Sequence, residues 1–135
     1  MKKIILVLFT FTFSVVSLFA QEPVSTTSSQ DSIVFDKMVH DYGTITQGDN
    51  GTCNFTFTNN GVSPLVLSNV RASCGCTIPE WPKEPIAAGA SGIIKVKYDT
   101  NRVGSFNKSI TVSSNAINSS VVLRITGNVN QKAEN

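Results

Sequence analysis

The sequence has few charged side chains and no cluster of like charge. Only 15% of its 135 residues are Asp, Glu, Lys or Arg, and 11 basic against 9 acidic side chains leave a formal net charge of +2. A nucleic-acid-binding surface needs a basic stripe that neutralises phosphates, so this composition argues against one. There is no heptad repeat and no repeat of solenoid period, and the length suits one domain.

The sequence also lacks the residue sets of common catalytic centres. It has a single histidine, His40, and no glycine-rich phosphate loop. No nucleophile–base pair accompanies the His40-Asp41-Tyr42-Gly43 segment, in which Asp41 and Gly43 suit a bend. We expect His40 to be a half-exposed, hydrogen-bonded strand residue. The protein is therefore predicted not to be an enzyme and to need no cofactor.

Residues 1–20 have the pattern of a secretory signal. Lys2 and Lys3 precede an apolar run at residues 4–16, and Ala20 supplies a small residue before the predicted cleavage. Polar residues interrupt the run, which is short for a membrane anchor. The sequence predicts a periplasmic or secreted protein with no stable membrane span after cleavage. Without the two lysines, nine basic and nine acidic side chains remain, and the formal net charge is zero.

Three parts are predicted after the signal. Residues 21–32 are rich in Ser, Thr and Gln, with too little apolar content to form a core, and are interpreted as a flexible leader. Residues 33–130 are long enough for one modest core. Residues 131–135 form a short polar tail.

Alternating apolar and polar residues predict strands throughout the central part. In residues 52–58, for example, Cys53, Phe55 and Phe57 share one face. No segment has a helical apolar period of useful length. We therefore predict an all-β fold, a single immunoglobulin-like antiparallel β-sandwich of about seven strands. The predicted strands are residues 33–35, 39–45, 52–58, 65–73, 93–98, 106–113 and 121–129.

Three cysteines are the disulfide or thiol candidates: Cys53, Cys74 and Cys76. An odd number in an exported chain predicts one disulfide and one free thiol. A bridge from Cys53 to Cys74 or Cys76 is compatible with the topology, because two antiparallel strands bring these positions to the same end of the sandwich. The alternative is a Cys74–Cys76 bridge. Gly75 permits the tight backbone that it needs, and so small a ring is strained and labile, which would suit a redox role.

The same cysteines are the candidates for binding a metal. Two thiolates with the spacing of Cys74 and Cys76 can hold a soft ion such as copper(I). A closed zinc site would need two more ligands, for which the chain offers only Cys53 and His40. His40 is expected about 17 Å along its strand from the cysteine end. No metal site is therefore assigned.

The predicted loop of residues 74–85 is the candidate binding surface. It contains three prolines, Gly75 and the single tryptophan, Trp81. Aromatic side chains concentrate binding energy, so Trp81 is a candidate anchor for a partner. The alternative is that Trp81 packs the loop onto the domain.

Several motifs along the chain form a recognisable combination. They are His40-Asp41-Tyr42-Gly43-Thr44-Ile45, Phe55-Thr56-Phe57-Thr58-Asn59-Asn60-Gly61, Pro64-Leu65-Val66-Leu67, Ser73-Cys74-Gly75-Cys76-Thr77, Tyr98-Asp99, and Gly104-Ser105-Phe106-Asn107-Lys108-Ser109-Ile110-Thr111-Val112-Ser113-Ser114-Asn115. Together they resemble the bacterial domain-of-unknown-function family fifteen seventy-three, over about residues 33–129.

The resemblance implies an exported domain whose fold is similar to Hydin-type, major-sperm-protein and PapD-like immunoglobulin-like domains. These domains are mostly binding modules, and the family implies no established activity. The resemblance makes Cys74, Gly75 and Cys76 positions of a family motif. Cys53, by contrast, falls where the family usually has a different residue.

The sequence therefore predicts an exported, non-catalytic binding or structural module of the cell envelope. Its predicted partner is a protein or another envelope component and not a nucleic acid. The alternative function is a thiol redox or copper(I)-handling module centred on Cys74-Gly75-Cys76.

Overall fold

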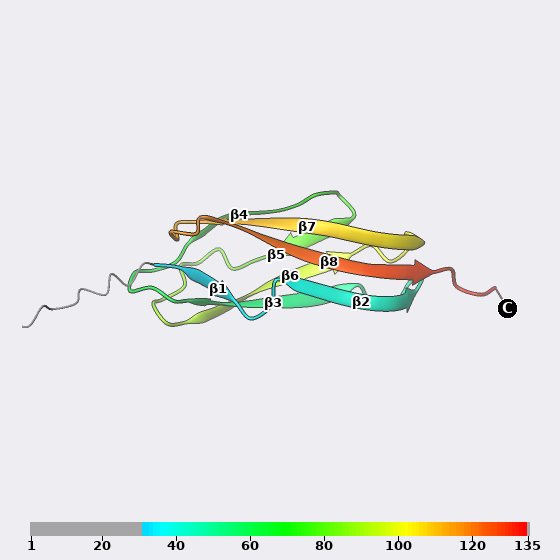
Figure 1. Cartoon of the computed structure of the whole chain (residues 1–135), viewed down its shortest axis with the longest axis horizontal. Coiled ribbons are helices and arrows are strands. Elements are labelled where there is room, and N and C mark those ends of the chain that lie inside the picture. Colours follow the sequence, from blue (N-terminus) through cyan, green and yellow to red (C-terminus); the bar gives the residue numbers. More distant parts are fainter. Residues whose placement is uncertain (1–30, 135) are drawn as a thin grey trace, which may run out of the picture.

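The computed structural model describes residues 31–134, which form a sandwich of two β-sheets (Figure 1). The predicted signal, residues 1–20, and residues 21–30 of the predicted leader lie outside the described residues. The all-β sandwich is confirmed, with eight strands in place of about seven. The strands are β1 (Ile33–Phe35), β2 (Val39–Thr46), β3 (Thr52–Asn59), β4 (Leu67–Ala72), β5 (Thr77–Glu80), β6 (Ser91–Tyr98), β7 (Gly104–Ser114) and β8 (Ser120–Asn130).

Each sheet contains four strands, in the orders β1-β3-β6-β5 and β2-β8-β7-β4. Neighbouring strands are antiparallel except β2 and β8, which run parallel. The chain leaves the first sheet after β1 and enters the second as β2, so its first two strands cover the same side of the sandwich (Figure 1). β4 and β5 are the edge strands of the opposite side.

The inner faces of the two sheets meet in one apolar core. The alternation in β3 directs Phe55 and Phe57 inward, and every second residue of β6, β7 and β8 meets them. The side chains that are at most 1% exposed include Phe55, Phe57, Ile94, Val96, Ile110, Val112, Leu123 and Ile125. Four of these come from each sheet, so the core itself holds the sheets face to face.

The predicted loop of residues 74–85 was wrong in part, because it contains strand β5. Its register pairs Thr77 with Tyr98 and Pro79 with Val96. Proline has no N–H to donate, so it is tolerated in an edge strand, and β5 is the edge of its sheet. The three prolines argue against a strand in this segment, so the sequence did not predict β5. Its partner strand, β6, is about 20 residues further along the chain.

The bend predicted from Asp41 and Gly43 is confirmed as an irregularity of β2. The register against β8 shifts between Asp41 and Thr44. Gly43 has a φ of 63°, and its N–H donates to the Asp41 carboxylate at 2.8 Å. The positive φ bends the strand at this position, and glycine adopts this conformation without steric strain.

Asp31, two residues before the predicted start of the sandwich, is hydrogen-bonded to the domain. The Asp31 carboxylate accepts hydrogen bonds from the N–H groups of Val62 and Ser63, at 2.7 and 3.1 Å. The Ile117 N–H donates to the Asp31 carbonyl at 2.8 Å. These bonds join the start of the domain to the β3–β4 and β7–β8 connections.

Asn59 is a buried polar side chain with its hydrogen bonds satisfied, and only 1% of it is exposed. Its Nδ2 donates to the carbonyls of Ser63 and Ile86 at 2.8 and 3.0 Å. Its Oδ1 accepts from the Gly61 N–H at 3.1 Å. One amide thus connects the β3–β4 turn to the segment before β6.

Replacing Asn59 by alanine should destabilise the domain. The substitution removes three hydrogen bonds and leaves the Gly61 N–H and the Ser63 carbonyl without these partners, and we expect the free energy of unfolding to fall by about 2–3 kcal/mol. Urea denaturation measures the change. Asn60→Ala is the control, because the Asn60 side chain is exposed and should cost less than about 0.5 kcal/mol. Equal stability of the two variants would contradict the assigned role of Asn59.

Candidate functional site

One end of the sandwich carries three connections that surround a hollow of about 560 Å³. The connections are β2–β3, β4–β5 and β6–β7. The hollow is lined by residues 48–51, Gly75, Cys76, Ile78 and residues 97–101. We call this region the disulfide end, because it includes the Cys74–Cys76 bridge. The sequence motif at residues 74–76 is thereby placed beside segments that lie far from it in the chain.

Backbone hydrogen bonds hold the three connections together. The Asp99 N–H donates to the Cys76 carbonyl at 2.9 Å, and the Tyr98 N–H donates to the Gly51 carbonyl at 2.8 Å. The Thr100 hydroxyl donates to the Asp49 carbonyl at 2.6 Å. A Cβ on Gly51 would clash with the Tyr98 carbonyl, so only glycine permits this approach. The disulfide end is therefore a preformed surface.

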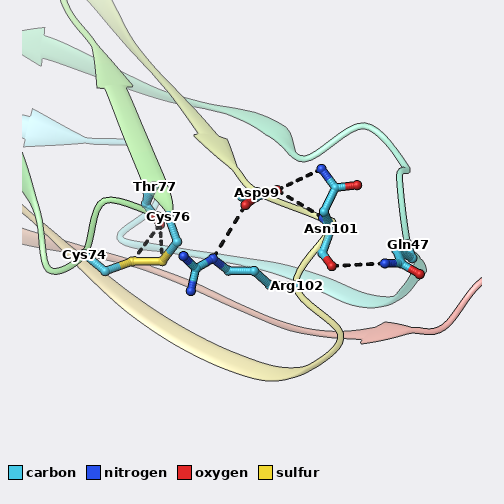
Figure 2. Close-up of polar contacts among 7 residues, drawn as sticks. All are labelled: Gln47, Cys74, Cys76, Thr77, Asp99, Asn101 and Arg102. Atoms are coloured by element: carbon cyan, nitrogen blue, oxygen red, sulfur yellow. Dashed lines mark hydrogen bonds and ion pairs between the residues drawn. A yellow bond between two sulfur atoms is a disulfide. The ribbon is translucent and has the colours of Figure 1, made fainter.

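The structure contains the Cys74–Cys76 disulfide and leaves Cys53 as a free thiol. The bridges from Cys53 to Cys74 or Cys76, which the sequence left open, are not formed. The Cα atoms of the bridged pair are 5.3 Å apart, within the usual range for a disulfide. The Thr77 hydroxyl lies 3.8 Å from the sulfur of Cys74 and 3.8 Å from that of Cys76 (Figure 2).

Cys53 is held in the core of the domain. Its side chain points inward from β3 in step with Phe55 and is 5% exposed. Burial raises the pKa of the Cys53 thiol, although a hydrogen bond with Tyr42 opposes this shift. The Tyr42 hydroxyl donates to the Gly51 carbonyl at 2.7 Å, which fixes the ring over this part of the core. Cys53 is consequently a packing residue with a protonated thiol.

A polar network forms the rim of the disulfide end (Figure 2). The Asp99 carboxylate accepts from the backbone N–H and the side-chain amide of Asn101, each at 3.1 Å. Arg102 Nε lies 3.5 Å from the same carboxylate. Gln47 Nε2 donates to the Asn101 carbonyl at 3.2 Å and links the β2–β3 connection to the β6–β7 connection.

The two binding-loop candidates have different positions. Gly75 lines the hollow, whereas Trp81 does not. The Trp81 ring is partly buried against the core, and Lys83 Nζ lies 2.9 Å from the ring centroid. This placement favours the alternative in which Trp81 packs its segment onto the domain. Ile78, which was not singled out from the sequence, is 59% exposed at the hollow.

His40 is in a structural setting, as predicted. It is half-buried on β2, and its Nδ1 lies 3.0 Å from Lys37 Nζ. Its ring packs edge-on against Tyr42, with centroids 4.5 Å apart. Burial, followed by the Lys37 charge, lowers the pKa of His40 below its usual value. Within residues 31–134, the bond with Lys37 is the only side-chain hydrogen bond that His40 makes.

Two features of residues 31–134 concern metals and membranes. Within residues 31–134, no three or more His, Cys, Asp or Glu side chains are grouped so that they could hold a metal ion. The sulfurs of Cys74 and Cys76 are bonded to each other in this structure, so they are not the pair of thiolates that a copper(I) site requires. The same part of the chain has no helix long and apolar enough to cross a membrane.

The burial of Cys53 predicts that its thiol is inert in the folded protein. We expect N-ethylmaleimide to label no cysteine in the native, unreduced protein, because Cys53 is buried and the other two are bridged. Denaturation without reductant should expose one reactive thiol, and reduction should expose all three. Mass spectrometry counts the adducts. Rapid labelling of native Cys53 would contradict this assignment.

Comparisons with solved structures support the same fold. The PapD-like domain 7 of human CEP192 has a TM-score of 0.65 at 8% identity, covering 90% of this chain and 99% of that one. A protein of unknown function from Porphyromonas gingivalis W83 also has a TM-score of 0.65, at 16% identity, with 77% of this chain covered. The YadV chaperone has a TM-score of 0.55 at 15% identity, covering 76% of this chain and 54% of that one.

These likenesses concern the fold alone, since all three identities are low. The chain spans 50% of the length of the Porphyromonas protein. No curated protein matches the sequence. The family model described as a protein of unknown function (DUF1573) matches residues 33–129, which include the whole sandwich up to the penultimate residue of β8. The chain belongs to the DUF1573 family.

Proposed function

We propose that this protein is an exported, non-catalytic module of the cell envelope that binds a protein partner at the disulfide end. The observation that carries the proposal is the preformed hollow, built by three connections from different parts of the chain. Loops held on a rigid β-scaffold are common positions for binding residues. Export is supported by the signal-like pattern of residues 1–20.

The composition of the surface suits a protein partner. Ile78 at the start of β5 and Val103 in the β6–β7 connection are 59% and 53% exposed. Around them lie the amides of Gln47 and Asn101 and the Asp99–Arg102 ion pair. Exposed apolar side chains within a polar rim are typical of protein interfaces. A formal charge of zero after loss of the signal makes long-range electrostatic steering a minor contribution.

The fold gives independent support for a binding role. Two of the similar structures are described as a PapD-like domain and as a chaperone. Chaperones act by contacting other proteins, and a sandwich of this kind offers loops and strand edges for such contacts. The described residues provide no catalytic set that would compete with this interpretation.

Ile78 should be required for capture of the partner. Ile78→Asp places a charge in the apolar part of the hollow, and we expect in vivo crosslinking from the disulfide end to lose its specific protein adduct. Affinity should fall at least tenfold, the usual consequence of disrupting an interface hot spot. Quantitative mass spectrometry of crosslinked, affinity-purified protein measures this loss.

Ile117→Asp is the matched control. Ile117 is 60% exposed, close to the value for Ile78, but lies in the β7–β8 connection at the opposite end of the sandwich. This variant should retain the adduct, and both variants should melt at the same temperature as the parent. Retention of the adduct by Ile78→Asp would contradict binding at the disulfide end.

Export predicts a processed N-terminus. Expressed in a Gram-negative host, the chain should be recovered from the periplasm or medium and begin at Gln21, as measured by intact mass and N-terminal peptide mapping. Lys3→Glu together with Lys2→Glu removes the positive start and should reduce processing. A cytoplasmic protein that keeps residues 1–20 would contradict export without bearing on the binding surface.

A further inference from the structure

The Cys74–Cys76 disulfide contributes little to holding the fold together. It closes a segment of only three residues, and the stabilisation that a disulfide gives by restricting the unfolded chain is least for short loops. The strands on both sides are held by other bonds. The Ser73 N–H donates to the Ser109 carbonyl at 2.9 Å, and β5 pairs with β6 directly after Cys76. Because the Cys74–Cys76 disulfide adds little to the stability of the fold, we looked to its chemical reactivity for a role.

The two sulfurs differ in access. Cys74 is half-buried, whereas Cys76 is 5% exposed. Gly75 between them is exposed, and a Cβ added there would meet no atom within 4 Å, so the backbone between the two cysteines faces open space. An incoming thiolate must approach along the line of the sulfur–sulfur bond, and of the two residues Cys74 is the more exposed to such an approach. Cys76 is then the leaving sulfur.

The surroundings of the bridge suit a departing thiolate. The buried Thr77 hydroxyl, 3.8 Å from each sulfur, is close enough to donate to the anion that bond breakage would produce. Figure 2 shows the Arg102 guanidinium directed from Asp99 toward the disulfide. Asp99 is held against this site by the bond from its N–H to the Cys76 carbonyl. Positive charge and hydrogen-bond donors lower the pKa of a cysteine thiol.

We propose that the Cys74–Cys76 disulfide exchanges with a dithiol of a partner protein, with Cys74 as the sulfur that is attacked. A partner thiolate forms a bond to Cys74 Sγ, the Cys74–Cys76 bond breaks, and its electron pair leaves on Cys76 Sγ. The second partner thiolate then attacks the partner sulfur of the mixed disulfide and releases Cys74. The partner dithiol loses two electrons and becomes a disulfide. The protein pair gains them, with two protons, and becomes a dithiol.

The hollow supplies the surface on which a partner segment would rest. Gly75, Cys76 and Ile78 line it on one side, and residues 97–101 line it on the other. A peptide that contacts Ile78 would lie next to Cys76, and Cys74 follows on the other side of Gly75. The exchange itself needs only access to Cys74, however, so it can be tested with a small thiol even if the proposed protein-binding role is wrong.

Glutathione provides the first test. The full-length exported protein is equilibrated with mixtures of reduced and oxidised glutathione, and each cysteine is quantified by differential alkylation and peptide mapping, which keeps Cys53 separate. We expect both the oxidised and the reduced forms of the 74–76 pair to be populated across these mixtures. A pair that stays fully oxidised even in excess reduced glutathione is a structural disulfide, and this result would overturn the proposal.

Variants in which one cysteine of the bridge is replaced by serine test which sulfur is attacked. With oxidised glutathione, Cys76→Ser should form a mixed disulfide on Cys74 at least tenfold faster than Cys74→Ser forms one on buried Cys76. Arg102→Gln should slow reduction of the parent disulfide several-fold, whereas Arg124→Gln, at an exposed position of strand β8, should leave the rate unchanged. Equal rates for the two cysteine variants would overturn the assignment of Cys74.

The double variant Cys74→Ser, Cys76→Ser separates exchange from folding. It should keep the near-ultraviolet circular dichroism of the parent and melt within a few degrees of it, as expected for a bond that closes a three-residue segment. Loss of the folded state would assign the bond a structural role and overturn the proposal.

Discussion

The packing of two inner sheet faces is the interaction on which the rest of the molecule depends. Phe55 and Phe57 from one sheet and Ile110 and Leu123 from the other are fully buried. Burial of each such side chain contributes about 1.5–3 kcal/mol. By comparison, closing the three-residue segment of the disulfide contributes about 1.6 kcal/mol in the chain-entropy account. The core therefore determines the fold, and the disulfide is a local feature built on it.

The separation of the core from the disulfide explains why Cys53 is a free thiol whereas Cys74 and Cys76 are bridged. Cys53 belongs to the core, where its thiol is shielded and serves as a small apolar group. Cys74 and Cys76 lie in a connection between the two sheets, where the chain passes from β4 to β5. Because β6 and β7 hold the flanking strands, the connection can carry a chemically reactive bond without weakening the core.

The sequence predicted the central strands well because their burial leaves a local pattern. Residues 52–58 and 93–98 alternate strictly, since one face of each strand meets the core and the other meets solvent. The bend at Gly43 was equally visible, because glycine and aspartate mark it directly. Strand β5 was missed, since Pro79 argues against a strand unless its place at a sheet edge is already known.

The site could be predicted only in part. Cys74, Gly75 and Cys76 form a contiguous motif, so the sequence alone identified them. Ile78 is close to the motif in the sequence but carries no signal of its own, and Arg102 reaches the motif only because the β4–β5 and β6–β7 connections meet. The parallel pairing of β2 with β8 likewise depends on a change of sheet after β1, which no local pattern encodes. Long-range topology, more than residue chemistry, limited the prediction.

Amide hydrogen exchange of the oxidised and reduced forms tests the central claim most directly. If the core carries the fold and the disulfide is a local exchange site, reduction should alter protection only near residues 74–77 and in the adjacent 99–102 segment. Protection in β3, β6, β7 and β8 should stay the same. Loss of protection throughout these four strands on reduction would show that the disulfide supports the sandwich, and would contradict the account.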